Sequence, residues 1–392
     1  MKYELILLGY SILLLPLMAI YSQNAAELFG LPNVINQSGF NKPLESLRGI
    51  AAGMVLMAHT TMYFYFEGWG AGYKTSSLTG QGGVTWFFML TGFLFWHMVL
   101  SDRLNLTLFF QKRIYRLVPA MMVMIGCVLL FEWIAAGLPA PAGAQVLAAL
   151  KNFMFGFAGV NDVFLANAVQ RINNIWTLRW EWLFYLCLPL LAALTRSWRG
   201  LTLTLLLYLL TMTDVVVAWN KETDAALLVS FYLGMCCAHL HILFVQHPQR
   251  YTFVVKLFSG YLGFLLVFGL SCLSLWLPHD LIRSRNLLFV CLNAPLFLWF
   301  FMQSHPTNGM RQHQWLNSVS LLTLGKISYS LYLWHLVVSY FVHSLYARQI
   351  LPGQGGWLEI LTMPFFVIFL SVPIAILSYK YVEHPFMSKW KK

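Results

Sequence analysis

The sequence is short of charge: only 10% of its 392 residues are Asp, Glu, Lys or Arg, whereas 59% are hydrophobic. A soluble globular domain carries roughly 25% charged residues, so this composition excludes an ordinary water-soluble domain and indicates a membrane protein. Cysteine is also scarce. The six cysteines all lie inside apolar stretches, without the paired spacing of a disulfide framework or a metal site. We therefore expect free thiols and no metal site.

Basic residues are in excess, with a formal net charge of +11, but they are not concentrated in one segment. Nucleic-acid binding requires a basic face, and here Lys and Arg stand in short clusters between apolar runs. Nucleic acid is therefore not an expected partner. In membrane proteins such clusters mark the loops on the cytoplasmic side, so we interpret the excess as a topology signal.

Apolar runs long enough to cross a bilayer, about 20 residues each, follow one another along the chain after a first, separate run. They cover approximately residues 45–66, 83–100, 117–136, 176–194, 201–218, 225–245, 257–277, 287–303, 327–347 and 358–379. The sequence thus predicts an all-α fold, a polytopic membrane helix bundle with a ten-helix core plus one extra N-terminal hydrophobic helix. We expect residues 1–40 to form that helix and a linker, and residues 41–392 to form the ten-helix transmembrane domain.

The first apolar run, residues 5–21, fits a signal peptide poorly. Its N-terminal end holds one Lys offset by Glu4, and no small-residue cleavage site of the A-x-A kind follows it. We favour an uncleaved extra helix. With the Lys42 end of the 45–66 helix in the cytoplasm, most Lys and Arg fall on the cytoplasmic side. The C-terminus is then predicted to be cytoplasmic and the N-terminus to lie outside.

Ionisable side chains within the apolar runs are the candidates for function, because such a group is costly in a bilayer unless it is paired or hydrated. The candidates are Arg48, His59, Arg179, Glu181, Asp214 and His335, with Glu67 and Glu132 near the outer ends of their helices.

Arg48 and His59 lie on one predicted helix. A separation of 11 residues returns to within about 20° of the same helix face and spans roughly 16 Å along the axis. One face would then carry a cation near the cytoplasm and an imidazole in the outer half. The alternative is an interfacial arginine whose head reaches water and a histidine hydrogen-bonded to a neighbouring helix.

Glu181 lies about five residues into its predicted helix, at a depth similar to that of His59. A carboxylate beside an imidazole fixes its tautomer and stabilises the imidazolium, as a general base requires when it takes a proton from a hydroxyl. We therefore predict that Glu181 orients His59. The alternative is an ion pair of Glu181 with Arg179 or another cation, although residues i and i+2 face opposite sides of a helix.

Two further pairs lie at helical spacing. Arg113 and Arg116 share a face at the predicted cytoplasmic start of the 117–136 helix, and guanidinium groups match phosphate oxygens. The alternative is an ordinary positive-inside anchor. Tyr332 and His335 share a face near the middle of the bilayer, where they form either a buried polar packing pair or part of a substrate channel.

Six segments occur in order along nearly the whole chain. They are Leu47-Arg-Gly-Ile-Ala-Ala with His59 at R-x10-H spacing, Trp86-Phe-Phe-Met-Leu-Thr-Gly-Phe-Leu94, Arg113-Ile-Tyr-Arg-Leu-Val-Pro119, Trp176-Thr-Leu-Arg-Trp-Glu-Trp-Leu-Phe-Tyr185, Ile327-Ser-Tyr-Ser-Leu-Tyr-Leu-Trp-His335 and Tyr381-Val-Glu-His-Pro-Phe386. Together they resemble the membrane acyltransferase-3 superfamily of integral membrane O-acyltransferases, of the glycan O-acetylase type. Thr91 and Thr177 stand where this family often has Ser, and the N-terminal helix is additional.

The resemblance implies ten transmembrane helices with both ends in the cytoplasm, in a bacterial inner membrane. It also implies transfer of an acyl group, usually acetyl, from cytoplasmic acyl-coenzyme A to a hydroxyl of an extracytoplasmic glycan, such as a surface polysaccharide or a lipid-linked sugar. Acyl-coenzyme A is then a co-substrate and no cofactor is bound. By analogy His59 matches the motif histidine and Arg48 its partner arginine. Likewise Arg113 and Arg116 match the R-x-x-R pair, and Glu181 the acid of the W-x-x-x-x-E segment.

The residues and the resemblance fit one mechanism. Arg113 and Arg116 hold the nucleotide end of acyl-coenzyme A, the pantetheine arm follows the Arg48 face, and His59 activates the acceptor hydroxyl at the thioester. Direct transfer and an acyl-enzyme relay both remain open. Because no hydrolase-like domain follows Lys392, we expect no handover to a second domain of the same chain.

Two alternative functions remain. One is transfer of succinyl or another acyl group to a different acceptor. The other is a glycan or lipid transporter whose buried His and Glu carry protons, although no internal repeat and no pair of Gly/Pro-broken segments indicates an inverted-repeat transporter.

Overall fold

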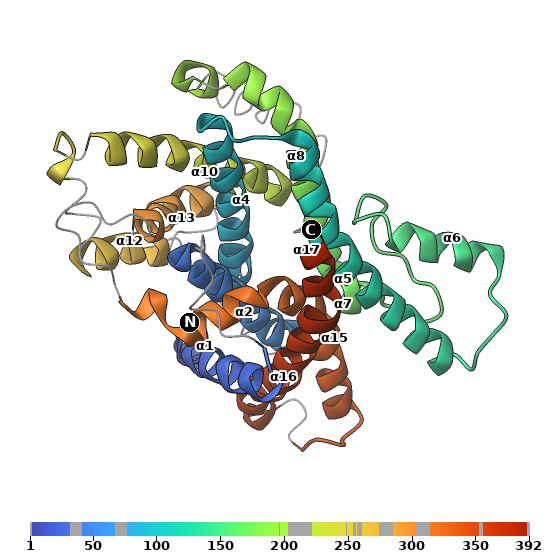
Figure 1. Cartoon of the computed structure of the whole chain (residues 1–392). Coiled ribbons are helices and arrows are strands. Elements are labelled where there is room, and N and C mark those ends of the chain that lie inside the picture. Colours follow the sequence, from blue (N-terminus) through green and yellow to red (C-terminus); the bar gives the residue numbers. More distant parts are fainter. Residues whose placement is uncertain are drawn as a thin grey trace.

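The computed structural model describes residues 2–31, 41–66, 77–195, 197–202, 222–247, 249–253, 256, 261–273, 285–302, 314–352 and 356–389. Every regular element in these segments is a helix (Figure 1), which confirms the all-α prediction for this part of the chain. Glu67, Asp214 and most of the predicted 201–218 helix lie outside the described residues.

The long helices follow the predicted spans. They are α1 (Lys2–Leu28), α2 (Lys42–Phe66), α4 (Gly82–Leu100), α5 (Leu106–Ala135), α8 (Trp176–Thr195), α10 (Glu222–Gln246), α12 (Tyr261–Leu273), α13 (Arg285–Met302), α15 (Ser328–Ala347) and α16 (Trp357–Ser378). Shorter elements between them are η1 (Ser77–Gln81), α6 (Gly143–Asn152), α7 (Val169–Ile172), η2 (Asn173–Ile175), η3 (Gln314–Asn317), α14 (Val319–Lys326), η4 (Tyr379–Glu383) and α17 (His384–Lys389).

Several of these helices are long and apolar enough to cross a membrane. Among the described residues, five helical segments meet that condition, or six when α14 and α15 are taken as one span bent by 71°. Exposed leucines and phenylalanines line the outward faces of α1, α5 and α16, as expected for surfaces in contact with lipid. The chain is therefore an integral membrane protein, whereas the count of ten plus one helices stays a prediction.

Helix α5 begins eleven residues before the predicted start at 117. Asn105 caps it, since its side-chain oxygen accepts a hydrogen bond from the backbone N–H of Leu108 at 3.1 Å. The apolar run stops at the basic residues, but a helix can continue beyond the hydrocarbon layer. The predicted boundary was therefore wrong, and Arg113 and Arg116 lie within the helix instead of at its first turn.

Helix α1 packs against the bundle along much of its length. Its buried side chains form one apolar cluster with residues of α2, α14, α15 and α16. Polar contacts add to this packing at the C-terminal end of α1: Ser320 donates to the Gln23 side chain at 2.7 Å, and Lys380 donates to the Phe29 carbonyl at 2.7 Å. The extra hydrophobic helix is thus part of the helical assembly.

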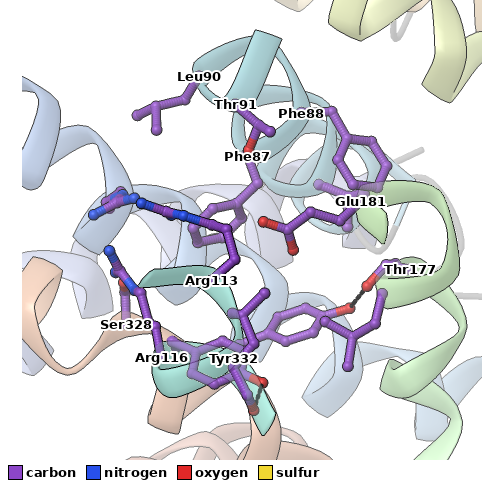
Figure 2. Close-up of a pocket in the computed structure, with 15 residues that line it drawn as sticks. Phe87, Phe88, Leu90, Thr91, Arg113, Arg116, Thr177, Glu181, Ser328 and Tyr332 are labelled. Atoms are coloured by element: carbon purple, nitrogen blue, oxygen red, sulfur yellow. Dashed lines mark hydrogen bonds between the residues drawn. The ribbon is translucent and has the colours of Figure 1, made fainter. Parts of the chain in front are cut away.

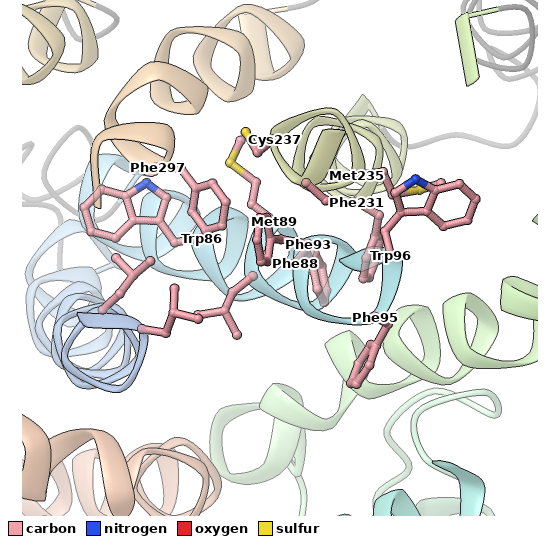
Figure 3. Packing of buried hydrophobic residues seen from close by; sticks show 14 of the residues in the cluster. Trp86, Phe88, Met89, Phe93, Phe95, Trp96, Phe231, Met235, Cys237 and Phe297 are labelled. Carbon is pink, nitrogen blue, oxygen red and sulfur yellow. The ribbon is translucent and has the colours of Figure 1, made fainter. Parts of the chain in front are cut away.

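Helix α4 lies at the centre and packs on α10, α2 and α13 (Figure 3). Its aromatic side chains interleave with those of α10; for example, the rings of Phe88 and Phe231 stack at 4.6 Å. Close approach of the two backbones depends on glycine. A methyl group at Gly234 would meet the backbone of Met89, and one at Gly92 would meet the backbone of Phe231. Small residues serve this purpose widely in membrane helices.

A second glycine contact joins α2 to α14. A methyl group at Gly49 would lie 2.8 Å from the backbone nitrogen of Gly325, and one at Gly325 would meet the backbone of Glu45. The chain then bends between α14 and α15. This contact therefore fixes the first turns of α2 against the start of α15.

The segment before α8 enters the interior of the bundle. Arg171 of α7 and Glu132 of α5 are both buried and form an ion pair at 2.8 Å, and Arg171 also donates to the carbonyls of Leu165 and Ala166. Three residues later, the buried Asn174 donates to the backbone carbonyls of Tyr332 and Leu333, in the second turn of α15. Helix α8 consequently starts deep inside the bundle. In contrast, α6 stands clear of it (Figure 1).

Substitution of Gly234 by Ala tests the α4–α10 contact. Because the added methyl group would meet the Met89 backbone, we expect a clear fall in the midpoint of thermal unfolding in detergent. The matched control is Gly126→Ala in α5, where nothing lies within 4 Å of the added methyl group. There, the higher helix propensity of Ala, worth about 1 kcal/mol, predicts no loss. Equal stability of the two variants would contradict this packing.

The buried pair of Glu132 and Arg171 makes a second stability prediction. Arg171→Met or Glu132→Leu alone leaves one buried charge without its partner, which costs about 3–5 kcal/mol. The double variant removes both charges, so its unfolding midpoint should lie closer to that of the wild type than either single variant. Losses that simply add would show that the two side chains are not coupled.

Candidate active site

A pocket among α2, α4, α5, α8 and α15 brings together most of the predicted polar residues (Figure 2). Arg48, Arg113 and Arg116 line it from α2 and α5, and Glu181 lines it from α8. The remaining lining residues are Val84, Phe87, Phe88, Leu90, Thr91, Leu117, Thr177, Leu178, Ser328, Tyr329 and Tyr332. In Figure 2, Arg113 and Arg116 lie on one side of the pocket and the Glu181 carboxylate on the other.

Each of two arginines has a carboxylate of its own. Arg48 donates to Glu45 at 3.3 Å, one turn away on α2. Arg116 lies 3.9 Å from the buried carboxylate of Glu383, which also accepts a hydrogen bond from Ser330 at 3.1 Å. Charged groups that lose most of their contact with water are stable only when they are paired or hydrogen-bonded. The glutamates thus hold the guanidinium groups in place at the pocket.

Arg113 is placed by aromatic groups. Its guanidinium carbon lies 4.7 Å from the centre of the Phe95 ring, it donates a hydrogen bond to the Tyr185 hydroxyl, and Glu181 attracts it electrostatically. Tyr185 in turn donates to the Glu181 carboxylate. The Nε atom of Arg113 is buried and has no hydrogen-bond partner among the described residues. One strong donor in the pocket is therefore available to a ligand.

Tyr332 of α15 also lines the pocket. Its hydroxyl lies 2.6 Å from the Thr177 hydroxyl and donates to the Asn174 carbonyl at 2.9 Å. Its own backbone carbonyl accepts from the Asn174 side chain at 2.6 Å. These bonds join α15 to the start of α8. The ring of Tyr332 lies 5.6 Å from that of His335, measured between ring centres.

One turn beyond Tyr332, two histidines meet. His335 Nε2 lies 3.0 Å from His59 Nδ1, and the two ring centres are 4.8 Å apart. His335 is fully buried, whereas His59 is partly exposed. Nδ1 of His335 also lies 2.6 Å from the carbonyl of Tyr332, and Nδ1 of His59 lies 2.9 Å from that of Val55. The sequence did not predict that these two histidines would form a pair.

The predicted contact between Glu181 and His59 is replaced by other contacts. In the described part of the chain, His59 bonds to Val55 and His335, and Glu181 bonds to Tyr185. The cause is the deep start of α8: the prediction placed Trp176 at the outer end of a membrane span, but Asn174 is already fixed inside the bundle. Glu181 therefore lines the arginine pocket, where it attracts Arg113 and Arg116 electrostatically.

The sequence predicted Arg48, Glu181, His59 and His335 as ionisable groups within apolar runs. It predicted Arg113 with Arg116, and Tyr332 with His335, as pairs at helical spacing. The structure places the three arginines, Glu181 and Tyr332 around the pocket and brings the two histidines together. The prediction from sequence missed Asn174 because this amide is not ionisable and precedes the predicted 176–194 run. It also assigned no role to Glu383, although this residue lies in a segment that the resemblance had marked. Among the described residues, no group of three His, Cys, Asp or Glu side chains is close enough to hold a metal ion.

Comparison with known proteins gives the chain its family. Residues 41–379 match the family model described as an acyltransferase domain. The O-acetyltransferase OatA of Staphylococcus aureus (strain NCTC 8325) is 26% identical over 333 residues, which cover 78% of this chain and 52% of the relative. A second S. aureus protein (strain COL) that carries an O-acetyltransferase name is 24% identical over 395 residues, covering 88% of this chain and 56% of its own.

The chain thus spans about half the length of the curated relatives it matches. No solved structure is significantly similar to it. The family model nevertheless includes every residue of the pocket and both histidines of the pair. The chain belongs to the acyltransferase-3 family.

Proposed function

We propose that this protein is an integral membrane O-acyltransferase that moves an acetyl group from cytoplasmic acetyl-coenzyme A to a hydroxyl of an extracytoplasmic glycan or lipid-linked sugar. We further propose that it resides in a bacterial inner membrane with its C-terminus in the cytoplasm. One observation carries the proposal: in a member of an acyltransferase family, α2 and α15 both run from an arginine-lined pocket to a pair of imidazoles.

The arginines suit the phosphate groups of coenzyme A. Guanidinium groups bind phosphate oxygens through two parallel hydrogen bonds, and Arg113 keeps a buried Nε donor without a partner among the described residues. Arg48 and Arg116 are already balanced by Glu45 and Glu383. A phosphate that enters the pocket would share these cations with the glutamates. We assign Arg48, Arg113 and Arg116 to the donor and Glu181 to the support of Arg113.

His59 is the proposed general base. It lies 11 residues beyond Arg48 on α2, which corresponds to roughly 16 Å along the helix. Its imidazole would take the proton of the acceptor hydroxyl as the oxygen attacks the thioester carbonyl. The carbon–sulfur bond then breaks, and the proton passes to the departing thiolate, giving the ester and free coenzyme A. General acid–base catalysis of this kind contributes about 10²–10⁴-fold to a rate.

Replacement of an arginine in the pocket should weaken donor binding. For Arg113→Gln and Arg116→Gln we expect the KM for acetyl-coenzyme A to rise about 10- to 100-fold, because a hydrogen bond to a charged group is worth about 1.5–3 kcal/mol. Steady-state release of coenzyme A measures this change. The matched control is Arg103→Gln, at an exposed position in the turn before α5. An equal rise for the control would contradict a specific donor site.

Loss of the base should abolish transfer. Purified protein and its His59→Ala variant are incubated with radiolabelled acetyl-coenzyme A and cell-envelope glycan, and label in the glycan and free coenzyme A are measured. We expect the variant to lose at least about 100-fold in rate while it elutes as folded protein. Full activity of this variant would contradict the role of His59.

The same assay separates the other functions. Transfer with succinyl-coenzyme A but not with acetyl-coenzyme A would change the donor and leave the site intact. A transporter would consume no acyl-coenzyme A, and it would move glycan across the membrane of proteoliposomes that contain it. That pair of results would show that the proposal is wrong.

A further inference from the structure

The hydrogen-bond partners of the two histidines show which nitrogen of each ring carries the proton. A neutral imidazole has one N–H donor and one acceptor nitrogen, and a backbone carbonyl can only accept. His335 Nδ1 lies 2.6 Å from the Tyr332 carbonyl, so Nδ1 carries the proton of this ring. Its Nε2 is then the acceptor.

The same rule applies to the second ring. His59 Nδ1 faces two acceptors, the Val55 carbonyl at 2.9 Å and His335 Nε2 at 3.0 Å. It therefore carries the proton and shares it between them. The lone pair of His59 is left on Nε2, the nitrogen that points away from both partners.

We propose that His335 is a positioning residue that, together with the Val55 carbonyl, holds His59 in the Nδ1–H tautomer, so that Nε2 of His59 is the base that takes the proton of the acceptor hydroxyl. This inference rests on the proposed function of His59. When Nε2 of His59 binds the proton, the ring becomes a positively charged imidazolium. The hydrogen bond from its Nδ1–H to Nε2 of His335 then stabilises that charge. His335 thus takes the position that a carboxylate holds beside the histidine of a catalytic triad.

The surroundings of His335 support this role. Its side chain is 1% exposed, and its partner carbonyl at Tyr332 also accepts from the Asn174 side chain. That amide donates as well to the carbonyl of Leu333 at 2.8 Å. The backbone that orients His335 is therefore held by a residue from outside α15. Replacing the hydrogen-bond partner that orients a metal-bound histidine costs about 10–100-fold in activity, and we expect the same range for the partner of His59.

Two amides separate the functions of the two nitrogens. In His335→Gln the amide oxygen can occupy the place of Nε2 and accept from His59, whereas in His335→Asn the amide nitrogen can occupy the place of Nδ1 and bond only to Tyr332. Both variants are polar, uncharged and smaller than His. We expect kcat to fall about 10–100-fold for the Asn variant. The kcat of the Gln variant should stay at least tenfold higher than that of the Asn variant. The KM for acetyl-coenzyme A should change little in both.

The control is His343→Asn, two turns further along α15, where the imidazole lies 3.6 Å from the Glu359 carboxylate. This variant should keep its kcat. Equal activity of the Asn and Gln variants at position 335, whether both are high or both are low, overturns the inference, since a role in packing alone does not distinguish them.

A measurement on the unaltered protein tests the tautomer directly. In protein labelled with ¹⁵N at histidine, the signals that disappear in His59→Ala belong to His59. We expect its Nδ1 to show the chemical shift of a protonated nitrogen and its Nε2 that of an unprotonated one. The opposite pattern overturns the inference.

These results are separable from the proposed function. If His59→Ala keeps its activity, the proposed function of His59 fails. If His59→Ala is inactive while His335→Asn is fully active, only the positioning role of His335 fails.

Discussion

The hydrogen bonds from the Asn174 side chain to the backbone of α15 determine the arrangement of the whole site. They hold the segment before α8 inside the bundle, where a chain crossing a membrane would ordinarily still be at the surface. Two results follow. Glu181, about two helical turns after Asn174, lines the same pocket as the arginines, and the Tyr332 carbonyl is placed to accept from His335. The buried pair of Arg171 and Glu132 supports the same segment from the other side.

Burial of so many charges is possible because most of them are matched. Arg48 with Glu45, Arg116 with Glu383, and Arg113 with Glu181 and Tyr185 form a nearly balanced set. A set of this kind costs less desolvation energy than isolated charges, but it contributes little net stability. Its value is geometric: the guanidinium groups are already oriented in a site of low dielectric constant, where interactions with a phosphate are stronger than in water.

Much of this arrangement could be predicted from the sequence. Apolar runs placed most of the described long helices to within a few residues, because hydropathy reports directly on lipid exposure. The helical period correctly put Arg113 and Arg116 on one face. The start of α5 and the partner of Glu181 could not be predicted. Both depend on where a polar segment sits relative to the bilayer, and hydropathy alone treats every charged or amide-rich stretch as a surface loop.

The pairing of His59 with His335 also could not be predicted from the sequence. The residues are 276 positions apart, and their contact depends on the crossing of α2 and α15. That crossing is set by Gly49 and Gly325, whose missing side chains let the α2 and α14 backbones touch just before the bend. Glycine in a run of small apolar residues gives no indication of which distant helix it will meet.

Because Arg48 and His59 lie on one unbroken helix, the distance between the proposed phosphate site and the proposed base is constant. A helix of this length neither stretches nor shortens appreciably. A donor would therefore fit only if the linker between its phosphate and its thioester matches this fixed distance. All coenzyme A esters share that linker. Discrimination among acyl groups then has to occur beyond the thioester carbon, in the space around the two imidazoles, and it can evolve there without disturbing how the nucleotide is held.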